Sequence, residues 1–305
     1  MRILVLGAGG IGGYFGGRLA ESGKDVTFLV RNKRKVSLSE NGLVINSVNG
    51  NYVFSPKLIT KEDSVEPYDV VLLSTKAYHL ENAIEDLKPF IGEQTVIIPL
   101  LNGIAHVEKL QQAFGENKVF GGLCIIETTL DSQGEINHTS DFDQLIFGEL
   151  HGEQTERAKK IESALSGTRA KIILSDNINK DMWHKYLMIT VMSSVTTLMH
   201  APIGPIRDSE DGKSYIEDMY NEVAQIMRIH QAPISNNIVN NYMKSLDNLS
   251  YHFKTSMQRD MEKGLNIEGH HIQGYMLNLA HQYHFEAPLL RSAYQHLNVY
   301  NEMLN

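Results

Sequence analysis

One lysine in the sequence has a setting that could support proton transfer. Lys185 directly precedes a stretch without charge, Tyr186 to Met199, which predicts a helix buried on all sides. A lysine at the edge of such burial is expected to have a lowered pKa, because desolvation disfavours its ammonium form. It can then donate or accept a proton near neutral pH. The alternative is a lysine whose stem packs while its ammonium reaches water, and these residues alone leave both possibilities open.

A serine and a glutamate form a second polar pair in the same half of the chain. Ser256 and Glu268 stand on either side of Gly264, which predicts a break between two helices. The two side chains could therefore meet across a helix–turn–helix. Alternatively, each stabilises the first turn of its own helix, where polar and acidic side chains are favoured.

A glycine-rich loop stands close to the first residue of the sequence. The motif G-x-G-x-x-G is formed by Gly7, Ala8, Gly9, Gly10, Ile11 and Gly12. In such a loop the first glycine permits a tight turn, the second admits a pyrophosphate, and the third allows close packing of helix on strand. The loop follows the apolar run Ile3–Leu6 and precedes a predicted helix, whose N-terminus would face the anion. This context predicts a dinucleotide site.

The residues after the second predicted strand bear on the choice of dinucleotide. The strand Val26–Val30 is followed by the cations Arg31, Lys33, Arg34 and Lys35. An acidic residue at this place would bond the ribose 2′-hydroxyl of NAD, whereas an arginine accommodates a 2′-phosphate. The sequence therefore favours NADP(H), with a solvated basic loop as the alternative.

Two further strand ends carry polar residues. Lys76 follows the predicted strand Val70–Leu73, and Asn102 with Gly103 follows Val96–Leu101. Ligands of open α/β sheets bind outside the carboxyl ends of the strands. Lys76 could place a second cation near the cofactor, and Asn102 could bond the ribose or the substrate. A solvated lysine and an ordinary Asn-Gly turn are the alternatives.

The predicted secondary structure that must position these residues differs between the two halves of the chain. Up to residue 176, short apolar runs alternate with amphipathic stretches, which predicts a Rossmann-type, doubly wound parallel sheet. The expected strands of this sheet are Ile3–Leu6, Val26–Val30, Val70–Leu73, Val96–Leu101 and Val119–Ile126, with antiparallel edge additions at Glu135–Thr139 and Gln144–Glu149.

The second half of the chain, residues 177–305, is predicted to be an all-α domain. Its helices are expected near Ile178–Met199, Lys213–His230, Asn236–Asp247, Phe253–Lys263, Glu268–His281 and Ala287–Met303. We therefore expect a dinucleotide-binding domain over 1–176 and a helical substrate and catalytic domain over 177–305.

Composition excludes several other classes of protein. The 305 residues suffice for two domains, at roughly 150 residues each. A net charge of −8 argues against a nucleic-acid partner. No apolar stretch is long enough to predict a membrane span, and the adjacent pair His270–His271 does not have metal-ligand spacing, so no metal is expected. The single cysteine, Cys124, fits a reducing, cytoplasmic compartment.

Together these positions resemble the ketopantoate reductase family over essentially the whole chain. The anchors are the glycine motif, Arg31, Lys76, Asn102-Gly103, Trp183-x-Lys185, and Ser256-Met257 followed by Glu268. The resemblance implies a C-terminal domain like that of 6-phosphogluconate dehydrogenases. It also implies NADPH-dependent reduction of 2-dehydropantoate to (R)-pantoate, a step towards coenzyme A.

The resemblance also implies a role for each site residue. Lys185 would protonate the ketone oxygen, Asn102 would contact substrate and cofactor, and Ser256 would bind the substrate carboxylate. Glu268 would bind the substrate hydroxyl or the cofactor ribose. The 2′-phosphate side of NADPH would be held by Arg31 and Lys76.

The sequence departs from the family around these residues. Asparagines usual in the family are replaced here by Ile189, Ser193, Ile203 and Phe253. Amide donors that bind a substrate hydroxyl or carboxylate strongly affect discrimination. Another branched 2-oxoacid, reduced in the manner of a D-2-hydroxyacid dehydrogenase, is therefore an alternative substrate.

Two broader classes of function are the alternatives to a 2-oxoacid reductase. A non-catalytic NADPH-binding sensor would not require Lys185 with Glu268. A dehydrogenase of a phosphorylated sugar acid would need a basic cluster in the helical domain, and the sequence shows no suitable one. The apolar helical domain could also supply the face of a homodimer.

Overall fold

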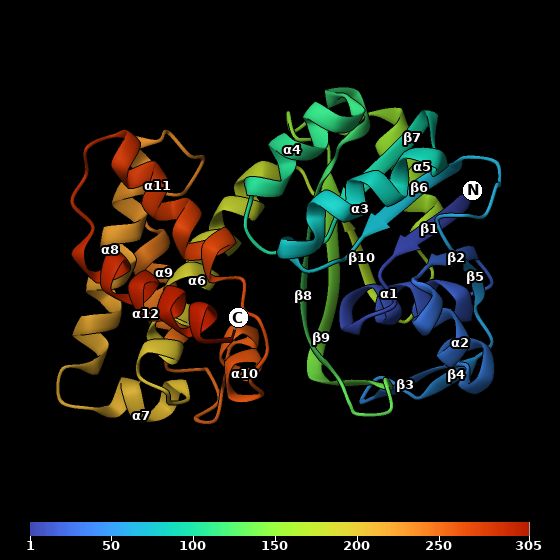
Figure 1. Cartoon of the computed structure of the whole chain (residues 1–305). Coiled ribbons are helices and arrows are strands. Elements are labelled where there is room, and N and C mark those ends of the chain that lie inside the picture. Colours follow the sequence, from blue (N-terminus) through green and yellow to red (C-terminus); the bar gives the residue numbers. More distant parts are fainter. Residues whose placement is uncertain (305) are drawn as a thin grey trace. The chain divides into compact units, whose positions relative to one another are not determined.

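A computed structural model describes residues 1–304 and divides the chain into two compact units (Figure 1). The first unit comprises Met1–Leu101 and His106–Asn179. The second comprises Asn102–Ala105 and the chain from Lys180 onward. Asn102 thus belongs to the helical unit, although it directly follows the sheet of the first unit along the chain.

The first unit contains a parallel five-stranded sheet of Rossmann type. Its strands are β1 (Arg2–Leu6), β2 (Asp25–Leu29), β5 (Lys57–Ile59), β6 (Tyr68–Leu73) and β7 (Ile91–Pro99). Their order is β5-β2-β1-β6-β7, which is 3-2-1-4-5 when this sheet's strands are counted along the chain. The predicted fold class is confirmed. Because the order reverses between β1 and β6, ligands are expected at the carboxyl ends of these two strands.

Helices cover this sheet and bury its apolar strands. They are α1 (Gly10–Glu21), α2 (Asn32–Asn41), α3 (Leu80–Leu87), α4 (Ala105–Phe114) and α5 (Glu156–Leu165). Alternate residues of one strand belong to different clusters, since Ile3 and Val5 pack in one core and Leu4 and Leu6 in another. The strands are therefore buried on both faces, as their unbroken apolar runs predicted.

A second sheet packs on the other side of α1, and its arrangement differs from the prediction. It contains β3 (Leu43–Ser47), β4 (Tyr52–Phe54), β8 (Gly121–Leu130), β9 (Ile136–Gly148) and β10 (Lys171–Leu174). The expected strand Val119–Ile126 was placed in the parallel sheet, but there only Val119 bridges to Ile97. The residues from Gly121 onward pair antiparallel with β9 instead.

Glycines allow α1 to lie between the two sheets. A Cβ on Gly16 would come within 2.7 Å of Phe28 in the first sheet, and one on Gly13 within 2.5 Å of Ile136 in the second. The helix that follows the glycine motif is thus fixed from both sides by close packing.

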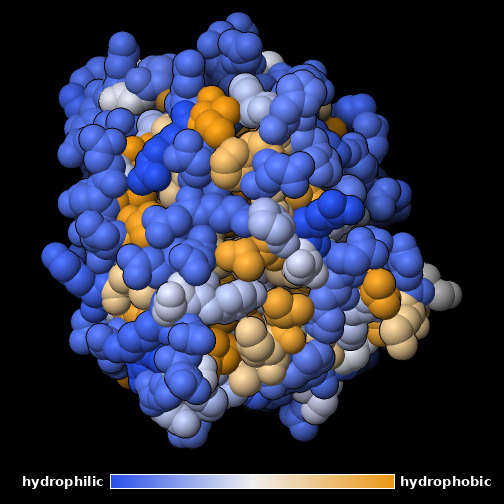
Figure 2. All heavy atoms as spheres, turned by 90° about the vertical axis from the view of Figure 1, so that its left-hand side faces the viewer, coloured by the Kyte–Doolittle hydropathy of each residue, from blue (hydrophilic) through white to orange (hydrophobic). Residues whose placement is uncertain are grey.

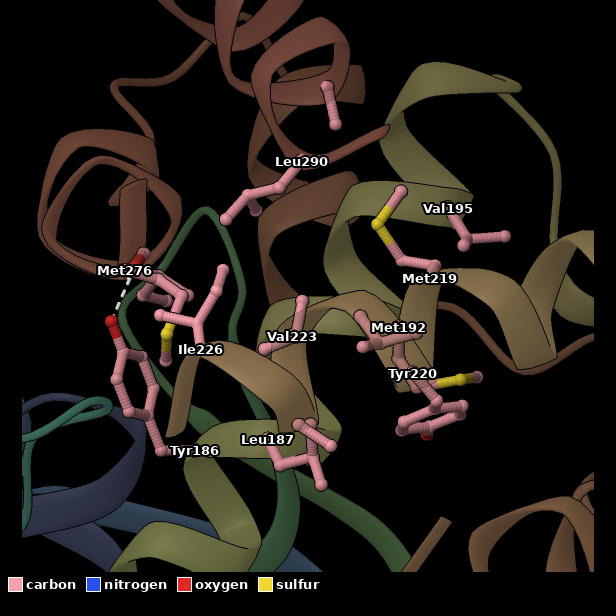
Figure 3. Packing of buried hydrophobic residues seen from close by; sticks show 14 of the residues in the cluster. Tyr186, Leu187, Met192, Val195, Met219, Tyr220, Val223, Ile226, Met276 and Leu290 are labelled. Atoms are coloured by element: carbon pink, nitrogen blue, oxygen red, sulfur yellow. Dashed lines mark hydrogen bonds between the residues drawn. The ribbon is translucent and has the colours of Figure 1, made fainter. Parts of the chain in front are cut away.

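The second unit is helical and has its own apolar core (Figure 3). Its helices are α6 (Ile178–Leu198), α7 (Ile203–Asp208), α8 (Gly212–Ile229), α9 (Ile238–Leu246), α10 (Ser256–Glu262), α11 (Tyr275–Gln282) and α12 (Pro288–Leu304). The short helix α7 was not predicted. The helix expected over Glu268–His281 begins with a π-helical turn, His270–Gly274, before α11.

The surface of the molecule is mostly hydrophilic in the view of Figure 2, with apolar side chains in separate spots. Exposed apolar residues of the helical unit include Met199, Leu265, Val299 and Met303. Over residues 1–304, no helix is both long enough and apolar enough to cross a bilayer.

Candidate active site

The glycine-rich loop adopts the geometry that its motif predicts. Gly7 has φ +101°, a conformation that favours glycine. The Ser74 hydroxyl, at the end of β6, contacts the carbonyl oxygens of Leu6 and Gly7 at 3.0 and 3.1 Å. The loop is therefore fastened to the strand at which the order of the sheet reverses.

Two other glycines of the motif serve different purposes. A Cβ on Gly12 would lie 2.0 Å from the Ser74 hydroxyl oxygen and 2.2 Å from the Gly7 carbonyl oxygen, so no larger residue fits. A Cβ on Gly9 would meet nothing within 4 Å. Gly9 is the N-cap of α1, and the first turn of this helix has no acidic residue. The helix N-terminus thus opens onto free space with donors for an anion.

Cations gather near this loop. Arg31 is exposed at the N-cap of α2, and Lys76 is half-buried at the start of the 3₁₀ turn Ala77–His79. Burial, together with the positive charge of Arg31, lowers the pKa of the His79 imidazole. Arg31 follows β2 and Lys76 follows β6, so both lie at the carboxyl edge of the parallel sheet, where positive charge favours an anionic ligand.

Arg34, in α2, contacts the glycine-rich loop, and the sequence did not single it out. Its Nη2 atom donates to the carbonyl oxygens of Ala8, at 3.2 Å, and Gly134, at 2.9 Å. Burial lowers the pKa of its guanidinium. The signal was its place in the basic run after β2, one helical turn beyond Arg31. Arg34 holds the glycine loop, whereas the Arg31 side chain is exposed.

The loop fits the dinucleotide that its motif implies. The hydroxyl of Thr75, at the carboxyl end of β6, is buried and has no hydrogen-bond partner within residues 1–304. A buried hydroxyl without a partner is unfavourable, so an additional polar group at this place would stabilise it. This hydroxyl, the open space at Gly9 and the cations at the strand ends are features that suit a phosphorylated ligand.

The first unit also has a cavity of about 700 Å³, which is separate from the glycine-rich loop. Its lining includes Met1, Asp69 and Glu93. These residues lie at or near the amino ends of β1, β6 and β7, whereas the glycine loop lies at the carboxyl ends.

The helical unit brings together the segments that carry Asn102, Lys185 and Glu268. Lys185 lies in α6 and is half-buried, as is Asn102. Glu268 is only 6% exposed and directly precedes the helical segment that begins the π-helix. Its carbonyl oxygen accepts the N–H groups of His271 and Ile272, both at 3.0 Å, so its backbone position is tied to this segment.

Ser256 differs in exposure from the other candidate residues of the helical unit. It is exposed and is the first residue of α10. The N-cap is Thr255, whose hydroxyl accepts the N–H of Gln258 at 3.3 Å. Capping of α10 is thus done by Thr255, which leaves the Ser256 hydroxyl exposed at the helix N-terminus.

The departures from the family have structural counterparts on α6. Ser193, one of them, is 3% exposed, and its hydroxyl donates to the Ile189 carbonyl. The hydroxyl also accepts from Gln273 Nε2 at 2.7 Å. Its hydrogen-bonding capacity is therefore used inside the protein. Ile189 is half-buried and lies one turn beyond Lys185 on the same face of α6.

A Rossmann-type unit and a helical unit with a half-buried lysine, a buried glutamate and an asparagine define a two-domain oxidoreductase. The family model described as Ketopantoate reductase PanE/ApbA matches residues 3–152. The model described as Ketopantoate reductase PanE/ApbA C terminal matches residues 177–301. The chain therefore belongs to the ketopantoate reductase PanE/ApbA family.

Relatives are similar over nearly the whole chain. An uncharacterized oxidoreductase of Bacillus subtilis, YkpB, is 45% identical over 300 residues, which are 98% of this chain and 99% of that protein. A 2-dehydropantoate 2-reductase of Lactococcus lactis is 28% identical over 232 residues, which are 75% of this chain and 74% of the relative.

Solved structures share the fold. The crystal structure of 2-dehydropantoate 2-reductase from Geobacter metallireducens has a TM-score of 0.89 at 24% identity, covering 98% of this chain and 99% of that one. The structure of D-mandelate dehydrogenase with NADH and anilino(oxo)acetate has a TM-score of 0.90 at 21% identity, with both chains fully covered.

Proposed function

We propose that this protein is an NADPH-dependent reductase of a 2-oxoacid, with Lys185 as the proton donor. The observation that carries the proposal is the half-buried Lys185 on α6, in the same unit as Asn102 and the buried Glu268. A protein that only bound the cofactor would not require this arrangement.

The chemistry follows from the residues. When bound, the nicotinamide supplies a hydride to the carbonyl carbon of the substrate. Negative charge then grows on the carbonyl oxygen, and the Lys185 ammonium stabilises this charge and delivers the proton. Asn102 contacts substrate and cofactor. Ser256 binds the substrate carboxylate, and Glu268 binds a substrate hydroxyl or the cofactor ribose.

The cofactor is held by the first unit in this proposal. The motif Gly7 to Gly12, including Ala8, Gly10 and Ile11, takes the pyrophosphate at the N-terminus of α1. Arg31 and Lys76 hold the 2′-phosphate, which distinguishes NADPH from NADH.

The substrate implied by the family is 2-dehydropantoate, reduced to (R)-pantoate. A second candidate, another branched 2-oxoacid, is favoured by the α6 face next to Lys185. There Ile189 is apolar and the Ser193 hydroxyl is already bonded to Ile189 and Gln273. A substrate hydroxyl on this face would meet an apolar side chain at Ile189 and a hydroxyl already engaged within the protein at Ser193.

The test is a panel of 2-oxoacids assayed with NADPH and with NADH. The expected result is turnover of one or more branched 2-oxoacids, with a clear preference for NADPH. Tight NADPH binding without turnover of any acid on the panel would instead identify a sensor.

We also infer a homodimer in the cytoplasm. A ketopantoate reductase from Staphylococcus aureus that shares the fold is described as dimeric. The exposed apolar residues of the helical unit, such as Leu265 and Met303, are available for a contact between two copies. Sedimentation of the purified protein tests this inference, and a monomer at micromolar concentration would contradict it.

A further inference from the structure

Tyr186, the residue after Lys185, lies where three segments of the helical unit meet. Its side chain is 1% exposed and packs in the core of this unit (Figure 3). The three segments are α6 itself, the π-helix His270–Gly274, and the turn Asn102–Gly103. Each of them carries, or directly follows, one of the candidate catalytic residues.

The Tyr186 hydroxyl connects α6 to the π-helix. It donates to the carbonyl oxygen of Ile272 at 2.6 Å, and Figure 3 shows this bond as the dashed line near Met276. The Ile272 N–H in turn donates to the carbonyl oxygen of Glu268 at 3.0 Å. A short chain of hydrogen bonds therefore links the residue next to Lys185 to the backbone of Glu268.

The Tyr186 ring lies next to the turn that begins at Asn102, with room for no more than a methyl group between them. A Cβ on Gly103 would lie 3.8 Å from the Tyr186 ring and 3.5 Å from the His271 carbonyl oxygen. Gly103 has φ +80°, so the turn depends on glycine at this place. The next residue, Ile104, packs against the same helical core. The turn therefore lies beside both the Tyr186 ring and the π-helix.

A second connection between α6 and the π-helix lies further from Lys185. The side-chain amide of Gln273, which is fully buried, donates to the Thr190 carbonyl at 3.2 Å and to the hydroxyls of Ser193 and Ser194 at 2.7 and 3.1 Å. Loss of the Tyr186 hydroxyl would therefore leave the two elements packed together and change only the connection nearest Lys185.

We propose that Tyr186 is a positioning residue for the reduction, an inference that rests on the proposed function. Its hydroxyl ties the helix that carries Lys185 to the π-helix that follows Glu268, and its ring lies next to the turn that carries Asn102. Misplacement of a catalytic group by about 1 Å can cost about 100-fold in rate. A bond that fixes these segments relative to one another therefore affects turnover without touching the substrate.

Tyr186 does not itself transfer the proton. Burial raises the pKa of its phenol far above the usual value. The hydroxyl thus keeps its proton at physiological pH and remains a hydrogen-bond donor to Ile272.

The test compares Tyr186→Phe with Tyr220→Phe in the full-length protein. Tyr220 is a matched control because it is 2% exposed and belongs to the same apolar core. For Tyr186→Phe we expect kcat to fall by about 10- to 100-fold, with the KM for NADPH unchanged. The primary isotope effect with NADPH deuterated at the transferred position should increase, because hydride transfer becomes more rate-limiting. Tyr220→Phe should show none of these changes.

The isotope effect separates positioning from loss of folded protein. Partial unfolding lowers the concentration of active enzyme but leaves the isotope effect of the remaining molecules unchanged. A Tyr186→Phe variant with the kcat and isotope effect of Tyr220→Phe would overturn the inference. A wild-type protein inactive on every 2-oxoacid would instead contradict the proposed function.

Discussion

Two arginines of one basic run have different environments. Arg34 is half-buried and its guanidinium bonds the carbonyl oxygens of Ala8 and Gly134. Arg31 is exposed at the N-cap of α2, and its charge adds to burial in lowering the pKa of His79. The sequence showed only that cations gather after β2, because it does not reveal which of them the protein uses internally.

Arg31→Ala is expected to weaken NADPH binding far more than NADH binding. The arginine would contact only the 2′-phosphate, which NADH lacks, and a hydrogen-bonded charge pair contributes about 1.5–3 kcal/mol. Titration of the free protein with each cofactor measures the effect. The control is Lys160→Ala, since Lys160 is an exposed cation that lines the cavity near the amino ends of the strands. Equal losses for NADPH and NADH would refute the phosphate role of Arg31.

Ile189→Asn is expected to shift the enzyme towards hydroxylated substrates. An amide one turn beyond Lys185 could bond a hydroxyl that the wild-type isoleucine leaves without a partner. The ratio of kcat/KM for 2-dehydropantoate to that for 3,3-dimethyl-2-oxobutanoate, which lacks the hydroxyl, should rise by about tenfold.

Ser193→Ala is the control for this substitution, because the Ser193 hydroxyl is already bonded to Ile189 and Gln273. It should leave the ratio unchanged. If Ile189→Asn and Ser193→Ala gave the same ratio as the wild type, the α6 face would have no part in specificity.

The strands of the first unit show which elements the apolar pattern of the sequence can predict. The unbroken apolar runs of β1, β2, β6 and β7 predicted buried parallel strands because such strands lack polar alternation. The two edge strands predicted over Glu135–Thr139 and Gln144–Glu149 form one strand, β9, in the second sheet. Asp143, which lies between the two predicted strands, is buried and accepts from the Tyr14 hydroxyl at 2.6 Å and from Asn49 at 3.1 Å. A single sequence does not display such distant partners.

The short helix α7 was missed for a related reason. Pro205 indicated a turn, but it lies in the first turn of α7, where the missing N–H has no helical partner to lose. The π-helical turn at His270–Gly274 was not predicted either, and hydrogen bonds join it to α6, which is distant in the sequence.

The glycine loop allows binding and folding to be tested separately. Gly9→Ala should leave the midpoint of thermal unfolding nearly unchanged, because Gly9 has φ −95° and an added Cβ meets nothing within 4 Å. It should weaken NADPH binding at least tenfold, because the methyl group occupies the space for the pyrophosphate. Gly12→Ala should instead destabilise the first unit, since its Cβ would overlap Ser74 and Gly7.

Calorimetry and NADPH titration of both variants check this expectation. Unchanged NADPH affinity in Gly9→Ala would mean that the dinucleotide does not approach the loop at this glycine.

For the whole molecule, three half-buried histidines make stability depend on pH. Burial lowers the pKa values of His79, His184 and His296 from their usual 6.5. Below that value the unfolded chain binds protons that the folded chain does not, so stability decreases as the pH falls through this window. The His184 Nε2 also accepts the N–H of Ser235 at 3.0 Å, which requires a neutral ring.

The midpoint of thermal unfolding should accordingly be lower at about pH 5.5 than at about pH 7. His184→Gln should reduce this difference, whereas His281→Gln, at an exposed position, should not. A midpoint that is constant or higher at the lower pH would show that these histidines do not resist protonation.

The candidate site was predictable to the extent that its residues follow strand ends and motifs. Gly7, Arg31 and Lys76 were found in this way, because parallel strands end at a common edge. Lys185 was proposed because the residues after it, Tyr186 to Met199, carry no charge, which predicts a buried helix. Connections such as those of Tyr186 or Gln273 were not predictable, because they join residues far apart in the chain through hydrogen bonds that leave no local pattern.

The most direct test of the reaction is a single-turnover measurement on Lys185→Ala, with Lys244→Ala as an exposed lysine control on α9. If the Lys185 ammonium protonates the forming alkoxide, oxidation of bound NADPH by the preferred 2-oxoacid should slow by 100-fold or more, as is typical when a general acid is lost. The Kd for NADPH should stay within about twofold. Oxidation at the wild-type rate, or slowing explained entirely by weaker NADPH binding, would contradict the assignment of Lys185.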